Sequence, residues 1–386
     1  MIGIEETTDS GVRILHVGNV FLDRPIRRVR KEASEDRRGQ MRESFCRLMQ
    51  AVEEKKIQLV LFSGNLVDNA FATNDTVEFL MREFGAHERC HFVIAPGSSD
   101  YYFEKSIYRS GRFPRNVHIF TEEILSRFDF DDIGVTVYGW AFLGEEHTFS
   151  PLAHKHVVGA DRLNIVCGYG NMEGEDAFCA IPSEQLASFG AHYAALSGPK
   201  RKHEGFLSLG GTVVSYSGHF ESLSFDDTDF GGVNLITALP MEDGARRLVA
   251  KRVVMGSYRY AEEIVDVSHL SRESEVTPLI HKRIAERGYN DKTVLRVRLR
   301  GSVAPEVAFL SLGTAADYGV YAFISVDETV PTDGTEALLY EMSAKGELYR
   351  HLYRAMTEGT PKSCARAARA FRVGYAALCE KDFTRY

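Results

Sequence analysis

The sequence predicts an α/β protein with an at least partly parallel sheet, followed by a smaller α+β domain. In the first part of the chain, short apolar strands alternate with amphipathic helices, which requires crossover connections between parallel strands. After Gly256 the pattern changes and helical stretches dominate. The length of 386 residues also exceeds the ~100–200 residues of one domain. We therefore expect two domains, residues 1–256 and residues 257–386.

Hydrophobic periodicity locates the elements of the first domain. Short apolar runs predict strands, and apolar residues at helical spacing predict a helix between the first two strands and another near residues 76–84. Because the loops at the carboxyl ends of parallel strands carry function, these loops are where chemistry should be sought. The expected strands are residues 12–17, 58–63, 91–95, 135–140, 163–167 and 193–196, and the first helix face consists of Met41, Phe45, Leu48, Met49 and Val52.

The elements nearer the carboxyl terminus have a different composition. Residues 205–256 are rich in glycine and β-branched residues and end in a strand-like segment, residues 245–255. Beyond residue 260 we expect mainly helix, with two strands and a nearly continuous helical stretch that glycine and proline interrupt. These later strands are residues 294–299 and 320–324, and the helical stretch is residues 336–381 with a break at residues 359–361.

Composition and charge exclude several classes of protein. An apolar fraction of 44% and a charged fraction of 26% are typical of folded soluble proteins. The net charge of −8 argues against a protein that coats nucleic acid through charge alone. No apolar stretch approaches the ~20 residues of a membrane span, and the polar amino terminus is unlike a signal peptide. The six scattered cysteines form neither a disulfide framework nor a zinc motif, so we expect a cytoplasmic protein.

Five loops at expected strand ends carry a recognisable order of motifs. They read HVGNVFLD at 16–23, SGNLVD at 63–68, PGSSD at 96–100, CGYGN at 167–171 and SGPKRKH at 197–203. This order resembles the calcineurin-like metallophosphoesterase family, in particular its SbcD-type DNA repair exonuclease subunits. Residues 215–225, residues 296–301 and the closing helices are also similar to segments of that subfamily.

The resemblance implies a fold and a chemistry. The implied fold is a four-layer α-β-β-α metallophosphoesterase-type sandwich with a smaller C-terminal α+β capping domain. In that family, motifs of the form D-x-H, G-D-x-x-D, G-N-H-D, an isolated His and G-H-x-H hold two divalent metals, such as manganese. A metal-bound hydroxide then attacks phosphorus in line.

This chain departs from the family at each ligand position. Neutral amides replace two aspartates, aromatic rings replace histidines, and an ammonium stands where a ligand is needed. Without metal, clustered carboxylates repel one another, so amides suit a metal-free pocket. We therefore expect no catalytic residues, no metal and no cofactor. The degenerate pocket consists of Asn19, Phe21, Asn65, Ser98, Ser99, Tyr169, Gly198 and Lys200.

Other interpretations of these residues stay open. Asn19 and Asn65, helped by Asp23, Asp68 or Asp100, are candidate oxygen ligands for one cation, although Asn and Asp ordinarily cap loops. The basic tract formed by Lys200, Arg201 and Lys202 is a candidate phosphate-binding site, but short charged runs usually face water. The histidines nearest the pocket in sequence, each more ordinary as a structural residue than as a ligand, are His16, His203 and His219.

Two further groups of residues bear on partners. Arg366, Arg369 and Arg372 form a drifting stripe on an alanine-rich helix. In the resembled subfamily this region docks on the coiled coil of an SbcC-type ATPase, which implies a partner-docking role for residues 336–386. A second basic run, blunted by nearby acids, consists of Arg24, Arg27, Arg28, Arg30 and Lys31, and the side chains expected in the core rather than an interface are Leu338, Leu339, Met342, Leu348, Leu352 and Tyr353.

These observations favour an SbcD-like pseudo-phosphoesterase that acts as a non-catalytic subunit or scaffold in DNA repair or DNA metabolism. Its expected partner is an SbcC-like coiled-coil ATPase, with DNA and a second copy of the chain as further candidates and no membrane. The alternative is an active metal-dependent exonuclease or phosphodiesterase with two manganese ions held by unconventional ligands. A weaker alternative is a metal-free module that binds a nucleotide or phosphate.

Overall fold

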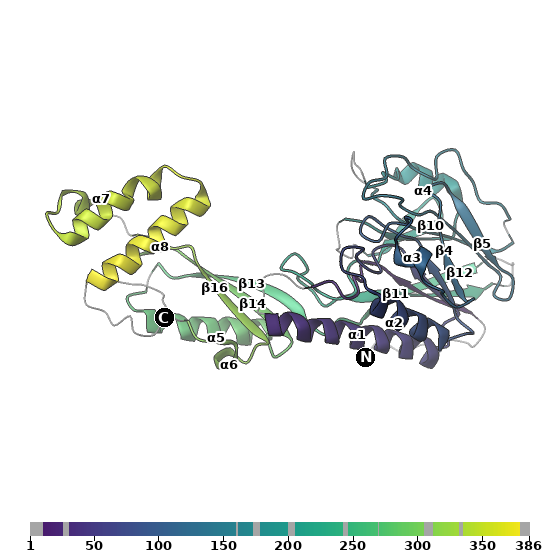
Figure 1. The fold of residues 1–386 in the computed structure, drawn as a ribbon, viewed down its shortest axis with the longest axis horizontal. Helices are drawn as coiled ribbons and strands as arrows, with labels where there is room; N and C mark the ends of the chain where they lie inside the picture. The colour runs from purple at the N-terminus through teal and green to yellow at the C-terminus, as the bar shows by residue number, and fades with distance from the viewer. Residues whose placement is uncertain are drawn as a thin grey trace. The chain divides into compact units, whose positions relative to one another are not determined.

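The chain forms two compact units, Met1–Ser257 and Tyr258–Tyr386, and each is described by itself. Figure 1 shows the computed structural model, in which β1 to β12 belong to the first unit and β13 to α8 to the second. The structure describes residues 11–25, 31–159, 161–172, 178–199, 205–241, 246–268, 270–304, 312–331 and 335–378.

The first sheet of the first unit has the order β12-β11-β1-β2-β3-β4. Strands β1 to β4 are parallel to one another, while β11 runs antiparallel to β1, and β12 antiparallel to β11. The bounds are β1 Val12–Val17, β2 Leu59–Phe62, β3 His91–Ile94, β4 Val117–Ile119, β11 Gly232–Pro240 and β12 Arg246–Val254.

The second sheet has the order β5-β6-β7-β8-β10-β9. Its four central strands are parallel, and both edge strands, β5 and β9, are antiparallel to their neighbours. The bounds are β5 Ser126–Phe130, β6 Val135–Gly139, β7 Leu163–Tyr169, β8 Tyr193–Ser197, β9 Leu207–Leu209 and β10 Thr212–Tyr216.

One apolar core joins the two sheets, because alternate residues of both contribute to it. Ile14 and Leu61 of the first sheet and Val137 and Ile165 of the second are fully buried in the same cluster. Each such side chain contributes about 1.5–3 kcal/mol by leaving water. The two sheets therefore pack face to face, and both sets of parallel strands are buried.

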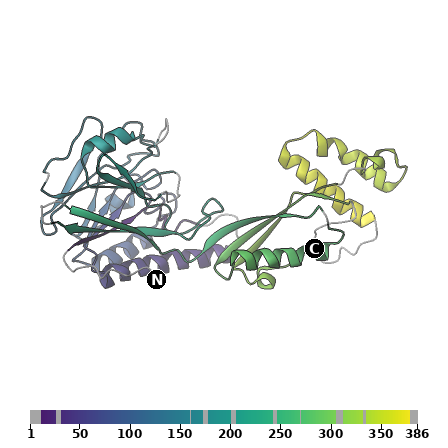
Figure 2. The same ribbon diagram turned by 180° about the vertical axis from the view of Figure 1, so that it is seen from behind.

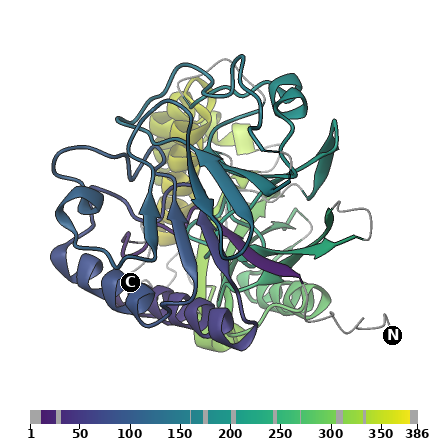
Figure 3. The same cartoon turned by 90° about the vertical axis from the view of Figure 1, so that its right-hand side faces the viewer.

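Helices cover the outer faces of these sheets, as Figure 3 shows for α1, α2 and α4. Phe45 of α1 (Lys31–Glu54) and Phe84 of α2 (Asn74–Gly85) contact each other and Phe62 of β2. On the second sheet, Phe189 of α4 (Ser183–Phe189) contacts Tyr138 edge-on. A short helix, α3, spans Ile107–Ser110.

The second unit is built on a three-stranded parallel sheet of order β13-β14-β16 (Figure 2). Helix α5 covers one face, where Ile280 packs with Leu295 and Val297. Its remaining helices include the pair α7 and α8, whose core centres on Tyr349 and Phe371. The bounds are β13 Arg259–Asp266, η1 Glu273–Glu275, α5 Val276–Arg287, β14 Thr293–Arg300, β15 Ser302–Val303, α6 Ala315–Tyr318, β16 Ala322–Asp327, β17 Val330–Pro331, η2 Thr335–Tyr340, α7 Ala344–Thr357 and α8 Pro361–Leu378.

The mixed α/β class expected from the sequence is confirmed, and the first strand has the expected bounds. Two expectations were wrong. Residues 259–266 form strand β13 rather than helix, and Met342 is 96% exposed rather than part of the core. Among the described residues, no helix combines the length and the apolar character that crossing a membrane requires.

Candidate functional site

The expected pocket lies where loops leave the carboxyl ends of β1, β2, β3, β7 and β8. Backbone hydrogen bonds hold the first two loops side by side: the amide of Asn19 donates to Gly64 at 3.0 Å, and the amide of Phe21 donates to Asn65 at 2.9 Å. Parallel strands bring their carboxyl ends to one edge of a sheet. The structure therefore brings together most of the residues expected to form the pocket.

Asn19 and Asn65, the two asparagines of the expected pocket, bond directly to each other. The side-chain amide of Asn65 donates to Oδ1 of Asn19 at 2.9 Å, and Oδ1 of Asn65 accepts from the amide of Ser99 at 2.9 Å. The side-chain amide of Asn19 donates to the carbonyls of Gly198 and Gly218 at 3.3 and 3.4 Å. Both side chains are buried and act as donor and acceptor, which an ionised carboxylate cannot do.

The backbone of the loops after β1 and β2 adopts an unusual conformation. Asn19, Phe21, Asp23 and Asn65 all have φ between 49° and 64°. Asn and Asp tolerate this left-handed region, whereas a bulky residue such as Phe21 loses roughly 1–2 kcal/mol there. The loop after β1 is therefore strained at Phe21, although its side chains are not those of a metal site.

The ring of Tyr169 fills the space between the loops. It is buried, and it lies so close to Gly64 and Gly97 that a Cβ on either glycine would be 2.6 or 2.8 Å from its Cδ2. Phe142 meets the ring edge-on, with centroids 5.3 Å apart. Within the part of the chain that the structure describes, no group of three His, Cys, Asp or Glu side chains could hold a metal ion. The residues present therefore do not fit a two-metal centre.

Asp100 has a structural role at the rim of this pocket. Its buried carboxylate accepts from the amides of Gly97, Asn65 and Leu66 at 2.6, 2.9 and 2.8 Å, and from the Tyr108 hydroxyl at 2.6 Å. Burial raises the pKa of Asp100 and, together with the nearby carboxylate, that of Tyr108. These four donors occupy both oxygens, so Asp100 joins the loops after β2 and β3 and is not positioned as a ligand.

The other two candidate carboxylates, Asp23 and Asp68, are each paired with an arginine. Arg42 binds both oxygens of Asp23 at 2.8 and 2.5 Å, and Thr76 donates to it at 2.8 Å. Burial works to raise the pKa of Asp23, but the Arg42 and Thr76 bonds outweigh it and lower that pKa. Asp68 pairs with Arg24 at 3.2 Å, and the Arg24 guanidinium lies 4.6 Å from the centre of the Phe21 ring.

Beneath the asparagines lies a buried chain of hydroxyl groups that we did not predict from the sequence. The Oγ atoms of Ser63 and Ser197 are 2.6 Å apart, those of Ser197 and Ser217 are 3.2 Å apart, and His16 bonds to Ser63 and to the Tyr193 hydroxyl, both at 2.9 Å. This chain links both sheets. The sequence did carry a signal for it, because each of these serines precedes a glycine at a strand end.

His219 lies in a different buried cluster. Its ring nitrogens are 3.3 Å from the Ser222 hydroxyl and 3.8 Å from an Asp227 oxygen, an order that resembles a hydrolytic triad. However, Ser222 is fully buried and donates to the Asp229 carbonyl at 2.6 Å. A nucleophile must reach its substrate, so this cluster is structural.

Several expected site residues are not described by the structure. Lys200, Arg201, Lys202 and His203 lie outside the described residues, as do Arg27, Arg28 and Arg30. The described pocket residues Ser98 and Ser99 are half-buried in the loop after β3.

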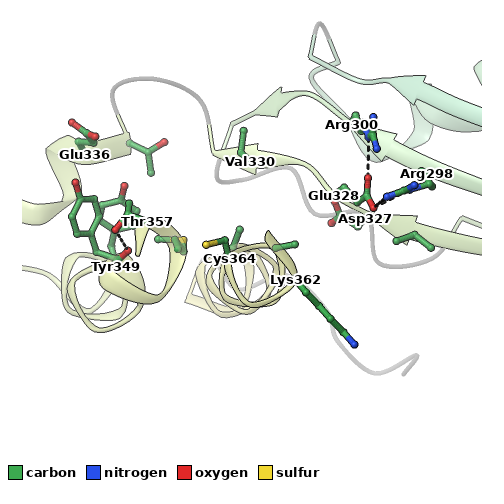
Figure 4. Close-up of a pocket in the computed structure, with 16 residues that line it drawn as sticks. Arg298, Arg300, Asp327, Glu328, Val330, Glu336, Tyr349, Thr357, Lys362 and Cys364 are labelled. Atoms are coloured by element: carbon green, nitrogen blue, oxygen red, sulfur yellow. Dashed lines mark hydrogen bonds and ion pairs between the residues drawn. The ribbon is translucent and has the colours of Figure 1, made fainter. Parts of the chain in front are cut away.

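The second unit contains a cavity of about 980 Å³ between its sheet and helices (Figure 4). Tyr349, Tyr353 and Met356 contribute apolar surface, while Glu328 pairs with Arg298 and with Arg300 at 2.9 Å. Both arginines of the cavity lining are therefore paired with a carboxylate of the same lining.

The expected stripe of three exposed arginines is wrong in one position. Arg366 and Arg369 are exposed, but Arg372 is buried, pairs with Asp327 at 2.5 Å and donates to the Thr329 carbonyl at 2.6 Å. Buried charges persist only when they are paired, and Arg372 has its partner 45 residues away in sequence.

Comparisons with known proteins found similar solved structures but no matching family. No protein-family model matches the chain, and no curated protein matches it in sequence. TT1561 of Thermus thermophilus is 14% identical, with 63% of this chain and 99% of that chain covered and a TM-score of 0.36. Vps29 of Chaetomium thermophilum is 12% identical, with 63% and 97% covered and a TM-score of 0.26.

Vacuolar Protein Sorting 29 of Cryptosporidium parvum is 15% identical, with 64% and 100% covered and a TM-score of 0.29. These are proteins of the calcineurin-like metallophosphoesterase fold. Because all three TM-scores are below 0.5, these similarities do not establish the fold of this chain. Its description as a mixed α/β protein rests on its own strands and helices.

Proposed function

We propose that this chain is a metallophosphoesterase-like protein without catalysis, in which the former metal centre has become a structural joint. The observation that carries the proposal is the direct bond between Asn19 and Asn65 with the ring of Tyr169 between the surrounding loops. Two-metal hydrolysis needs clustered carboxylates and imidazoles around two cations. Here the same loops hold each other through amides, hydroxyls and one aromatic ring.

The proposal includes the finer assignment of the first unit as a four-layer sandwich of the metallophosphoesterase type. Two six-stranded sheets that pack face to face, with α1 and α2 against one and α4 against the other, support it. The motif order in the strand-end loops supports it independently, since Asn19, Asn65 and Gly198 meet as that order implies.

The proposal also includes an SbcD-like scaffold role with an SbcC-like coiled-coil ATPase as partner through residues 336–386. Sequence resemblance is the main support. Exposed side chains of this region add surface suited to a partner. Tyr340 at the end of η2 is 85% exposed, Met342 just before α7 is 96% exposed, and Arg366 and Arg369 of α8 face solvent.

A hydrolysis assay tests the absence of catalysis. The purified full-length chain is incubated with bis-p-nitrophenyl phosphate and with linear DNA, each with and without Mn²⁺. We expect release of product at the rate of the protein-free control. Manganese-dependent hydrolysis that Asn65→Ala abolishes, while Lys55→Ala leaves it intact, would overturn the proposal.

A capture assay tests the partner. We expect an SbcC-like ATPase to co-purify with the wild-type chain, and the double variant Tyr340→Ser/Met342→Ser to capture at least about tenfold less, because hot-spot side chains carry most of an interface. Replacement of the exposed Val158 by Ser in the first unit is the matched control. Equal capture by all three proteins would contradict docking through this region.

A further inference from the structure

We propose that the outer edge of β12 binds an extended segment of a partner protein that has an acidic, an apolar and an acidic residue at every second position, opposite Arg247, Val249 and Lys251. Its solvent-facing residues Arg247, Val249 and Lys251 take no part in the asparagine pocket, and the inference is independent of the function proposed above. Strand β12 (Arg246–Val254) is labelled in Figure 1 and is the last strand of the first sheet.

The backbone of β12 is well prepared for strand addition. It pairs with β11 without a bulge over nine residues, from Val254 opposite Gly232 to Arg246 opposite Pro240. Among the described residues, no strand pairs with its other side, so about half of its backbone amides and carbonyls point outward. The strand contains neither proline nor glycine, which would interrupt such pairing.

The side chains of β12 alternate between core and solvent. Leu248 and Ala250 pack against the core between the sheets, while Arg247, Val249 and Lys251 are exposed on the other face. Val249 is 41% exposed. Within the part of the chain that the structure describes, the side chains of Arg247 and Lys251 have no hydrogen-bond or ion-pair partner.

Charge complementarity identifies the occupant. All four charged residues of β12 are basic, in a chain whose net charge is −8: Arg246, Arg247, Lys251 and Arg252. A partner strand with an apolar residue opposite Val249 and acidic residues two positions to either side would place one carboxylate opposite Arg247 and another opposite Lys251, which are favourable cross-strand pairs. A second copy of β12 paired antiparallel about Val249 would instead place Arg247 opposite Lys251. This repulsion disfavours self-association and favours an acidic partner segment.

Basic residues on an edge strand also serve simply to prevent edge-to-edge aggregation. Val249 distinguishes β12 from an edge that is charged throughout, because it places an exposed apolar side chain between the two free cations. An edge that served only for protection would bind neither peptide in the assay below, so the assay separates the two roles.

Fluorescence anisotropy with the full-length chain and a labelled SETVTES peptide, in which Glu, Val and Glu stand at every second position, tests the proposal. We expect saturable binding of this peptide and none of its basic counterpart SKTVTKS. The double variant Arg247→Glu/Lys251→Glu should weaken binding of the acidic peptide by at least about tenfold, or about 1.4 kcal/mol, and should bind the basic peptide instead. The matched control, Lys55→Glu/Arg89→Glu, makes the same charge change at exposed sites of the same unit.

A backbone readout separates strand addition from simple charge attraction. N-methylation of alternate peptide amides on one side of the strand should abolish binding, and N-methylation on the other side should leave it intact, because only one side faces β12. Absent binding, equal loss in the control variant, or indifference to both methylation patterns would overturn the proposal. A wild-type dimer that dissociates in Arg247→Glu/Lys251→Glu would also overturn it, since the edge would then bind a second copy.

Discussion

Introducing aspartates at positions 19 and 65, as in the motifs of the resembled family, should destabilise the protein rather than create a metal site. In Asn19→Asp/Asn65→Asp, two carboxylates face each other where Nδ2 of Asn65 now donates to Oδ1 of Asn19 at 2.9 Å. The donors to the Gly198 and Gly218 carbonyls are also lost. Losing a buried partner costs about 1–3 kcal/mol, and an uncompensated buried charge costs about 3–5 kcal/mol.

We therefore expect the first unit to lose at least about 3 kcal/mol at neutral pH. For a unit of this size that is a fall in Tm of about 6–12 °C, measured by calorimetry. The introduced carboxyls have a raised pKa in the folded state, because they are buried beside each other. The folded state then binds more protons than the unfolded state, so the deficit grows as pH rises above about 4 and shrinks below it. Asn65→Ala, which adds no charge, is the control without this pH dependence.

Titration with Mn²⁺ tests whether this double variant has gained a metal site. An ion at 100 times its Kd would stabilise the folded state by about 2.7 kcal/mol. Because Tyr169 fills the space between the loops, we expect no such recovery on titration with Mn²⁺. A manganese-dependent rise in Tm of several degrees, absent from the wild type, would refute the reasoning.

Three further predictions follow from buried groups. Tyr169→Ala should cost about 3–5 kcal/mol through the cavity it leaves, measured by urea unfolding, and a loss under about 1 kcal/mol would contradict the central position of the ring. Arg372→Ala should cost about 3–5 kcal/mol by leaving Asp327 unpaired, whereas the exposed Arg369→Ala should stay within about 0.5 kcal/mol; equal effects would contradict the burial of Arg372. Burial is the main reason that three histidines have a pKa below 6.5 in the folded state. As the pH falls below about 6.5, the unfolded state binds protons before the folded state does, so the urea concentration at the midpoint of unfolding should decrease. A constant midpoint down to about pH 5 would contradict this. These histidines are His118, His147 and His192.

Local patterns predicted much of the first unit from sequence. The strand at Val12–Val17 and the helix face containing Phe45 follow from periodicity, because a buried parallel strand is a short apolar run and a packed helix has one apolar face. Strand β13 was missed because its sequence, RYAEEIVD, has charged residues that suit a helix equally well; pairing with β14 decides its conformation.

Contacts between residues distant in sequence limited how much of the site could be predicted. Motif order predicted that Asn19 and Asn65 would meet, but not that Tyr169 would pack on two glycines or that Asp100 would bind the loop amides. Arg372 resembled its exposed neighbours in sequence, and only Asp327 explains its burial. Such contacts depend on tertiary packing, which a single sequence does not reveal through spacing.

Anomalous diffraction from crystals of the wild-type chain grown with Mn²⁺ tests the central claim most directly. We predict no manganese peak beside Asn19 and Asn65, an intact hydrogen bond between their side chains, and the Tyr169 ring packed against Gly64 and Gly97. Two manganese peaks held by these side chains, with the ring displaced, would contradict the account.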